Sequence, residues 1–346
     1  HLLAWKNLRR LHWLQPLATG RSMQDLPTIN FSTLHQASTR DALDRACAEW
    51  GFFYLTRHSI DRQLVRNMLE MMQQFFALPT EQKLSVERTA SNPWGFYNRE
   101  LTKNRRDWKE IFDVGPDIPT EELTDARAQW PDEAALKLPG FRSCVTAFSG
   151  ACEAVAQTLI QAISHNLGMP ERYLSSCFGA DHTSYLRLNY YPTCAQPAPL
   201  DAPHFPASGH LGISHHTDSG AITVLLQDMQ PGLQVWHDDR WHLIAPRDDA
   251  LVINIGDVVQ VWSNDRYRAP LHRVLAHASA PRFSAPYFYN PGYTTVYEPL
   301  PGVCTATHPP RYRPIRWSEF RARRAAGDYA DQGEEVQISD YRVRIP

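Results

Sequence analysis

The chain has 346 residues, of which 43% are hydrophobic and 21% are charged, a composition typical of a globular protein with a sizeable core. Its formal net charge of −2 gives no reason to expect nucleic acid or an anionic membrane as a partner. No apolar run approaches the roughly 20 residues that cross a bilayer. The six cysteines lack a paired C-x-x-C spacing, which argues against a disulfide scaffold and favours a reducing, cytoplasmic location. The oligomeric state stays open, and a monomer is compatible with the sequence.

Residues 1–22 are basic and contain no Asp or Glu. Such a segment is compatible with an organelle transit peptide. We instead expect a leader or an added extension outside the fold, because the chain opens on a histidine and nothing else in it points to an organelle.

The first half of the chain is expected to be mainly helical. Apolar residues recur at helical spacing in three segments, and a short apolar run separates the first two. Gly51 and Gly168 follow the first and third segments, where glycine commonly ends a helix. The expected helices are residues 39–50, 61–76 and 145–167, the short buried strand is residues 52–55, and the polar stretch 116–139 is the expected connection.

From Ser184 onward the apolar period changes from helix to strand. Short runs separated by Gly, Pro, Asn and Asp predict an antiparallel sandwich or barrel. The expected strands are residues 184–191, 221–227, 232–236, 250–255, 271–276 and 283–289. A last helix is expected at residues 317–326, where Arg321, Arg323 and Arg324 follow Glu319 in the order that suits the helix dipole, as on a solvated face.

Three residues have the chemistry of a metal site. His216 and Asp218 are separated by one residue, so on an extended segment both side chains project to the same face. His272 opens an apolar strand and can supply a third ligand from a neighbouring strand. Two imidazoles and one carboxylate leave the other positions of an iron ion open for substrate and oxygen, which is typical of non-haem iron oxygenases.

Two competing readings of these histidines are weaker. His237 and Asp239 repeat the His-x-Asp spacing, but their surroundings predict an exposed hairpin turn. His215 is a rival ligand, yet Asp218 then lies three positions away and faces the opposite side of a strand.

Arg282 and Ser284 form a candidate anion anchor. They are two residues apart on an expected strand, so their side chains point the same way. The planar guanidinium of arginine binds a carboxylate through two parallel hydrogen bonds.

Several motifs together resemble the iron(II)/2-oxoglutarate dioxygenase superfamily, in particular the branch of isopenicillin N synthase, anthocyanidin synthase and gibberellin oxidases. The resemblance covers about residues 26–295. It rests on residues 26–29 (LPTI), 51–53 (GFF), 189–192 (NYYP), 216–220 (HTDSG), 223–228 (TVLLQD), 232–235 (GLQV), 254–257 (NIGD), 271–274 (LHRV) and 282–284 (RFS).

The resemblance implies a mainly β fold with flanking helices: a double-stranded β-helix, or jelly roll, with an N-terminal helical region. The expected division is an N-terminal dioxygenase region at 26–125, an oxygenase core at 180–295 and a C-terminal extension with a helix at 296–346.

The resemblance also implies Fe(II) as cofactor and 2-oxoglutarate and O2 as co-substrates. Iron would be held by His216, Asp218 and His272, and the distal carboxylate of 2-oxoglutarate by Arg282 and Ser284. Tyr191 would support that carboxylate, with Asn189 near the metal-chelating end of 2-oxoglutarate. The implied reaction hydroxylates, desaturates or cyclises a small metabolite and releases succinate and CO2.

Two alternatives stay open on the sequence. Oxidases of the same fold, such as isopenicillin N synthase, keep Arg-x-Ser without using 2-oxoglutarate. A catalytically silent jelly-roll binding protein would keep the pocket without turnover.

The sequence identifies the substrate contacts least well. Phe96, Phe112 and Tyr289 are the candidate aromatic residues facing the substrate, and the segment 195–209, rich in Pro and Ala, is a candidate loop over the iron.

Overall fold

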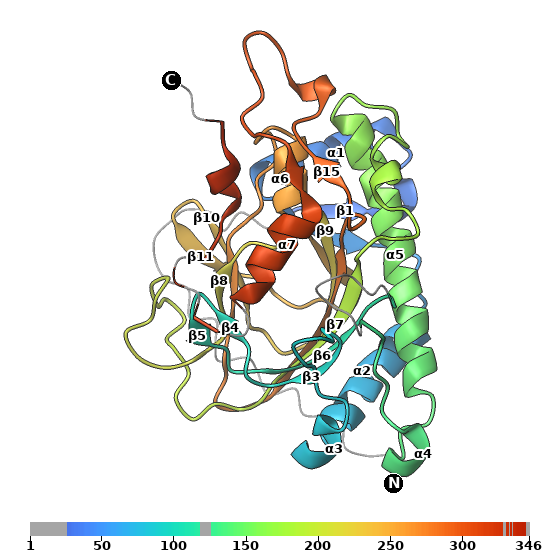
Figure 1. Cartoon of the computed structure of the whole chain (residues 1–346), viewed down its shortest axis with the longest axis vertical. Helices are drawn as coiled ribbons and strands as arrows, with labels where there is room; N and C mark the ends of the chain where they lie inside the picture. The colour runs from blue at the N-terminus through green and yellow to red at the C-terminus, as the bar shows by residue number, and fades with distance from the viewer. Residues whose placement is uncertain (1–25, 118–125, 328–329, 332, 334, 344–346) are drawn as a thin grey trace.

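Two facing β-sheets form the centre of the protein in this computed structural model, which describes residues 26–117, 126–327, 330, 331, 333 and 335–343. Long helices cover one side, and α7 crosses in front of the barrel (Figure 1). The segment 1–22 lies outside the described residues. Among the described helices, none is long and apolar enough to cross a membrane.

The larger sheet has eight strands, antiparallel except for the β1–β2 pair. In spatial order they are β1 (Thr28–Asn30), β2 (Phe52–Thr56), β12 (Ala250–Ile255), β9 (Ile222–Gln227), β14 (Arg282–Tyr289), β7 (Tyr185–Tyr191), β6 (Glu110–Val114) and β3 (Gly95–Tyr97). Strands from the first 114 residues therefore extend both edges of a sheet whose centre comes from the second half of the chain.

The smaller sheet is antiparallel and has four strands. Their order is β11 (Arg240–Leu243), β10 (Leu233–His237), β13 (His272–Leu275) and β8 (Leu211–His216). Two short ladders complete the strands: β4 (Leu101–Thr102) with β5 (Arg105–Arg106), and β15 (Val296–Tyr297) with β16 (Ile315–Arg316).

The helices α1, α2 and α5 pack against the outer face of the larger sheet in one apolar core. Asp61 caps α2 by accepting from the backbone N–H groups of Gln63 and Leu64. The α-helices are α1 (Ala37–Glu49), α2 (Arg62–Phe76), α3 (Thr80–Leu84), α4 (Glu133–Leu136), α5 (Phe141–Asn166), α6 (Asp257–Trp262) and α7 (Trp317–Ala326). Short 3-10 helices are η1 (Phe31–Thr33), η2 (Leu174–Cys177), η3 (Pro301–Val303) and η4 (Ile338–Tyr341).

The alternation of side chains along the central strands separates an apolar helix-facing side from a polar interior. On β14 the odd-numbered residues pack in the helix-side core, and Arg282 and Ser284 face the space between the sheets. On β7, Leu186 and Leu188 face the helices, whereas Arg187 lines the interior. Because the side-chain period of a strand is two, the register of each strand decides which residues reach the interior.

The three long helices and the six strands predicted from apolar periodicity are all present within a few residues of their expected ends. The structure adds β3 and β6 in a region given no strand, and it forms α6 where the sequence VVQVW resembles a strand. In α6 every residue is buried, so the polar face that would mark a helix in the sequence is missing.

Candidate functional site

Strand pairing brings the two candidate histidine ligands together. His216 ends β8 and His272 begins β13, and the two are direct partners across the ladder, with ring centroids 4.3 Å apart. Asp218 follows β8 by two residues, and its Oδ1 lies 3.6 Å from His216 Nε2 and 3.5 Å from His272 Nε2. Among the described residues these three form the one cluster of His, Cys, Asp and Glu that could hold a metal ion, with ligand atoms within 4.8 Å of one another.

Both imidazoles are oriented by the backbone. His216 Nδ1 lies 2.9 Å from the carbonyl oxygen of Ser214, and His272 Nδ1 lies 3.0 Å from that of Pro270. A carbonyl only accepts, so each Nδ1–H donates and each Nε2 is the nitrogen that faces the cluster. This arrangement fixes the tautomer that a metal-binding histidine needs.

The carboxylate of Asp218 is held on one oxygen and open on the other. Its Oδ2 accepts from Thr223 Oγ1 at 2.5 Å and from Asn254 Nδ2 at 2.7 Å. Oδ1 faces the two histidines. The donor set of two Nε2 atoms and one carboxylate oxygen therefore suits iron(II) at this position.

The electrostatics of the cluster favour the ligating protonation states of two of its members. Burial, with the neighbouring His272, lowers the pKa of His216 to about 3, so its ring is neutral at neutral pH. Burial opposes ionisation of Asp218, but the adjacent His272 and His216 lower the pKa of its carboxyl group below the ordinary value. Although burial acts in the opposite direction, the Asp218 carboxylate raises the pKa of His272, and a bound cation would replace that proton.

Two backbone hydrogen bonds from the start of α6 hold the turn that carries Asp218. The N–H of Asp257 donates to the carbonyl of Asp218 at 2.8 Å, and that of Val258 donates to the carbonyl of Gly220 at 3.0 Å. A Cβ on Gly256 would lie 2.3 Å from the Gly220 carbonyl oxygen, so only glycine permits this approach. The NIGD motif thus positions the carboxylate ligand through the backbone.

Arg282 is a buried cation with unused donors. Its side chain is 1% exposed, and it forms no ion pair with a described carboxylate. Nη2 donates to Gln227 Oε1 at 2.9 Å, whereas Nε and Nη1 have no partner. The Tyr191 ring lies 5.1 Å from the guanidinium, on the residue paired with Arg282 across β7 and β14. A buried charge in this state requires an anion.

Ser284 and Asn189 lie beside Arg282 and are direct partners across β7 and β14. Asn189 Nδ2 donates to Ser284 Oγ at 3.4 Å, and Asn189 Oδ1 is buried without a partner. Arg282, Ser284, Tyr191 and Asn189 therefore line one cavity with the metal cluster, and the unpaired donors of Arg282 fit a carboxylate of a bound dicarboxylate such as 2-oxoglutarate.

A cavity of about 230 Å³ joins these two groups. Both sheets line it, together with residues 101–104 of the β4–β5 hairpin and with Arg321 and Arg324 of α7. The metal cluster and Arg282 thus line one common cavity, which is the kind of site that binds a small molecule.

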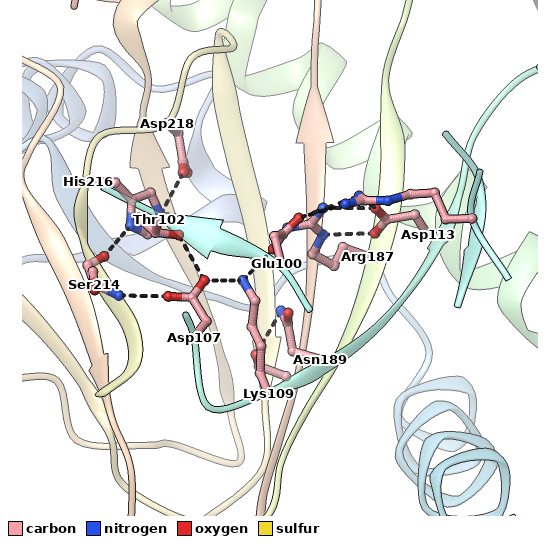
Figure 2. Close-up of polar contacts among 12 residues, drawn as sticks. Glu100, Thr102, Asp107, Lys109, Asp113, Arg187, Asn189, Ser214, His216 and Asp218 are labelled. Atoms are coloured by element: carbon pink, nitrogen blue, oxygen red, sulfur yellow. Dashed lines mark hydrogen bonds and ion pairs between the residues drawn. The ribbon is translucent and has the colours of Figure 1, made fainter. Parts of the chain in front are cut away.

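A buried ionic network forms part of the cavity wall and begins beside His216 (Figure 2). Asp107 accepts from the backbone N–H of Ser214, the residue that orients His216. Lys109 bridges Asp107 and Glu100, at 3.1 and 2.7 Å. The network continues through ion pairs of Glu100 with Arg187, Arg187 with Asp113, and Arg88 with Glu100 and Asp113. The network contains three basic and three acidic side chains, so their formal charges cancel. This part of the cavity wall is therefore polar but has no formal net charge.

The prediction that Phe96, Phe112 and Tyr289 face the substrate is wrong. All three are buried in the core between the larger sheet and the helices, and none lines the cavity. Phe96 and Phe112 pack around Phe75, and Tyr289 stacks on Phe178 with ring centroids 4.0 Å apart. Aromatic residues that do line the cavity are Phe52, Trp94, Tyr185, Tyr191, Phe288 and Trp317.

The segment 195–209, expected as a loop over the iron, does not lie over His216, Asp218 and His272. It packs against the outer side of the smaller sheet, where Arg273 donates to the carbonyls of Leu200, Ala202 and Pro203. His215, next to His216 but on the opposite face, also contacts this segment through the carbonyl of His204. The solvated face expected for α7 holds for Arg323 but fails for Arg321 and Arg324, which line the cavity.

Sequence reasoning missed Thr223, Asn254 and Gln227 as functional residues. Each is a buried polar side chain in an otherwise apolar strand, and each contacts Asp218 or Arg282. The sequence contained a sign of this, because a polar residue within an apolar strand is expected to be buried and therefore to need a hydrogen-bond partner. His237, the other candidate His-x-Asp residue, stacks on Trp50 at 3.9 Å, next to the β10–β11 turn.

Comparisons with known proteins agree with this geometry. A family model described as the 2OG-Fe(II) oxygenase superfamily matches residues 182–291, and one described as the N-terminal region of a non-haem dioxygenase in morphine synthesis matches residues 26–133. Gibberellin 2-beta-dioxygenase 6 of Oryza sativa subsp. japonica is 33% identical over 332 residues, which cover 92% of this chain and 85% of that protein.

Solved structures show the same fold. JOX2 in complex with 2OG, Fe and JA matches with a TM-score of 0.76 and 26% identity, over 92% of this chain and 90% of that one. A full-length Neurospora crassa protein in complex with alpha-KG and thymine matches with a TM-score of 0.75 and 27% identity, over 87% and 96%. The expected jelly roll with flanking helices is therefore confirmed. The chain belongs to the 2OG-Fe(II) oxygenase superfamily and is a non-haem Fe(II)- and 2-oxoglutarate-dependent dioxygenase that oxidises a small molecule.

Proposed function

We propose that His216, Asp218 and His272 bind the Fe(II) of this oxygenase, and that Arg282 and Ser284 bind the distal carboxylate of 2-oxoglutarate. The observation that carries the proposal is the common cavity: three convergent ligand atoms and a buried guanidinium with two unused donors line it together. The three ligand atoms suit a divalent iron ion. The guanidinium of Arg282 lacks a counter-ion, which a carboxylate of 2-oxoglutarate would supply.

The chain's own residues contribute binding, orientation and exclusion of water. Tyr191 packs against the guanidinium of Arg282 and excludes water from it, while the amide of Asn189 lies next along the wall toward the metal-chelating end of 2-oxoglutarate. The bound iron, with 2-oxoglutarate and O2, supplies an oxidant able to remove hydrogen from an unactivated C–H bond. The cavity wall then holds the substrate with one such bond toward the cluster, and we infer hydroxylation as the outcome.

The two alternatives are less well supported. The wall at Arg282 has two unused donor atoms, Nε and Nη1, that a carboxylate of 2-oxoglutarate would satisfy. A silent binding protein has no need for an Asp218 carboxylate held by two donors with one oxygen left for a metal.

Anaerobic titration of the metal-free chain with Fe(II), and then with 2-oxoglutarate, tests this assignment by visible absorption. A weak metal-to-ligand charge-transfer band that requires both additions is the expected result. Iron binding without the band would favour the oxidase alternative, and no iron binding would remove the three ligands from their proposed role.

The partner of the Asp218 carboxylate provides a further prediction. Asn254→Ala removes the 2.7 Å hydrogen bond to Asp218 Oδ2, so the carboxylate loses part of its orientation and iron affinity should fall by about 10- to 100-fold. The same iron titration measures the effect, with circular dichroism as the check on folding. Affinity equal to that of the unaltered protein would show that Thr223 alone suffices to hold Asp218.

We also infer that the enzyme works in the cytoplasm on a small molecule, with neither nucleic acid nor a membrane as a partner. All six cysteines are free, which suits a reducing compartment.

A further inference from the structure

The guanidinium of Arg321 is a charged group that the proposed function leaves without a role. Arg321 lies on α7 and lines the cavity, where its side chain is partly buried. It forms no ion pair or hydrogen bond with any described residue. Burial lowers its pKa, and only the hydroxyl groups of Tyr185 and Tyr293 act in the opposite direction.

Other cations that line the cavity have carboxylate partners. Arg324 pairs with Glu335 at 3.2 Å, and Lys103 pairs with the same residue at 2.8 Å. Arg88, Lys109 and Arg187 belong to the balanced ionic network. Apart from Arg282, which is assigned to 2-oxoglutarate, Arg321 is the one cation of the cavity lining that no described carboxylate neutralises.

The position of α7 places this charge at the site. Arg324, one turn after Arg321, donates to the carbonyl of Thr217, the residue between two of the proposed ligands, at 2.8 Å. In Figure 1, α7 crosses in front of the barrel. Arg321 therefore lies one helical turn from a contact with the metal-binding segment.

The cavity lining also contains aromatic side chains, and one of them, Tyr185, interacts electrostatically with Arg321. Trp94, Tyr185 and Phe288 all line the cavity, with ring centroids 5.5 Å apart for Trp94 and Tyr185 and 4.9 Å apart for Tyr185 and Phe288. Trp317, one turn before Arg321 on α7, also lines it. An apolar ring system would pack against these faces, while its charged end paired with the guanidinium.

We propose that the primary substrate is an organic acid with an aromatic or alicyclic body, and that Arg321 binds its carboxylate. The proposal rests on the proposed function, because it places the substrate in the cavity that the three proposed iron ligands and Arg282 line. The carboxylate lies at Arg321, the ring lies against Tyr185 and Phe288, and the bond to be oxidised is on the part of the ring system nearest His216 and Asp218.

Matched pairs of ligands test this proposal by calorimetry, on the anaerobic protein loaded with Fe(II) and saturating 2-oxoglutarate. The probes are phenylacetate, cinnamate and cyclohexylacetate, each beside its uncharged primary amide. Saturating 2-oxoglutarate fills its own site at Arg282, so the probe acids cannot bind there instead. At least one acid should bind, and bind more tightly than its amide.

Arg321→Gln should weaken binding of that acid by about 10- to 100-fold and leave the amide unchanged, because only the acid loses a charge-assisted pair. Arg321→Lys should keep part of the preference for the acid. Arg323→Gln, an exposed neighbour on the same helix, is the matched control and should change neither affinity.

Acid and amide binding equally well, an unchanged preference in Arg321→Gln, or no binding of any acid would each overturn the proposal. The charge-transfer band separates this failure from that of the proposed function. Arg321→Gln should still form the band with Fe(II) and 2-oxoglutarate, whereas a missing band in the unaltered protein would count against the proposed function itself.

Discussion

His272→Ala is expected to reduce turnover to background and to weaken Fe(II) binding by several orders of magnitude. The variant removes one of the three proposed protein ligands, which leaves His216 and Asp218 as the remaining two. Two protein ligands compete poorly with water for iron, so both metal binding and the charge-transfer band with 2-oxoglutarate should be lost. Iron titration and succinate release measure the two effects separately.

His215→Ala is the matched control for His272→Ala. Its ring is also buried, but it lies on the opposite face of β8 and contacts the carbonyl of His204. Iron affinity and the band should be retained in this variant. If His272→Ala kept full iron-dependent turnover, or if His215→Ala lost iron instead, the proposed ligand set would be wrong.

Arg282→Ala is expected to raise the 2-oxoglutarate concentration for half-maximal activity by about 150- to 4500-fold. The variant leaves the distal carboxylate in a buried site without its cation, and breaking one partner of a buried ion pair costs about 3–5 kcal/mol. Iron binding should not change, because Arg282 contacts none of the three proposed ligands. Succinate formation as a function of 2-oxoglutarate concentration measures the effect.

Arg282→Lys separates charge from geometry at this position. Lysine keeps the positive charge but lacks the planar pair of donors, so an intermediate requirement for 2-oxoglutarate is expected. An unchanged requirement in Arg282→Ala would remove Arg282 from its proposed role and would point to another cation of the cavity.

The periodicity of the apolar residues was sufficient to predict the long helices and the central strands. It could not predict, for every strand, which side chains face the cavity and which face the helices. Tyr289 lies five positions after Ser284 on β14, so simple alternation places it on the opposite face from the anion anchor, and the structure has it there. The neighbouring Phe288 lies on the interior face and lines the cavity. For Phe96 and Phe112 no such argument was available, since β3 and β6 were not expected, and the registers of β3 with β6 and of β6 with β7 depend on tertiary pairing.

Charged residues were the hardest to place from sequence. Arg187 lies in the interior, where it pairs with Asp113 on β6 and with Glu100 in a loop, both more than 70 residues away in the sequence. The charge order of α7 suits a solvated helix, but the helix packs across the barrel, so Arg321 and Arg324 turn inward while Arg323 stays exposed. Helix dipole arguments concern the helix axis and carry no information about which face is covered.

The sequence by itself determined the class of fold and the chemistry of the candidate ligands. Both depend on local patterns: strand alternation, residue spacing, and motifs such as HTDSG and RFS that keep their residues within one or two strands. Only the tertiary structure decided which polar groups surround those ligands. Asn254, Gln227 and the ionic network around Arg187 reach the cavity through pairings between distant segments, and a buried polar group is stable there only because those pairings satisfy it.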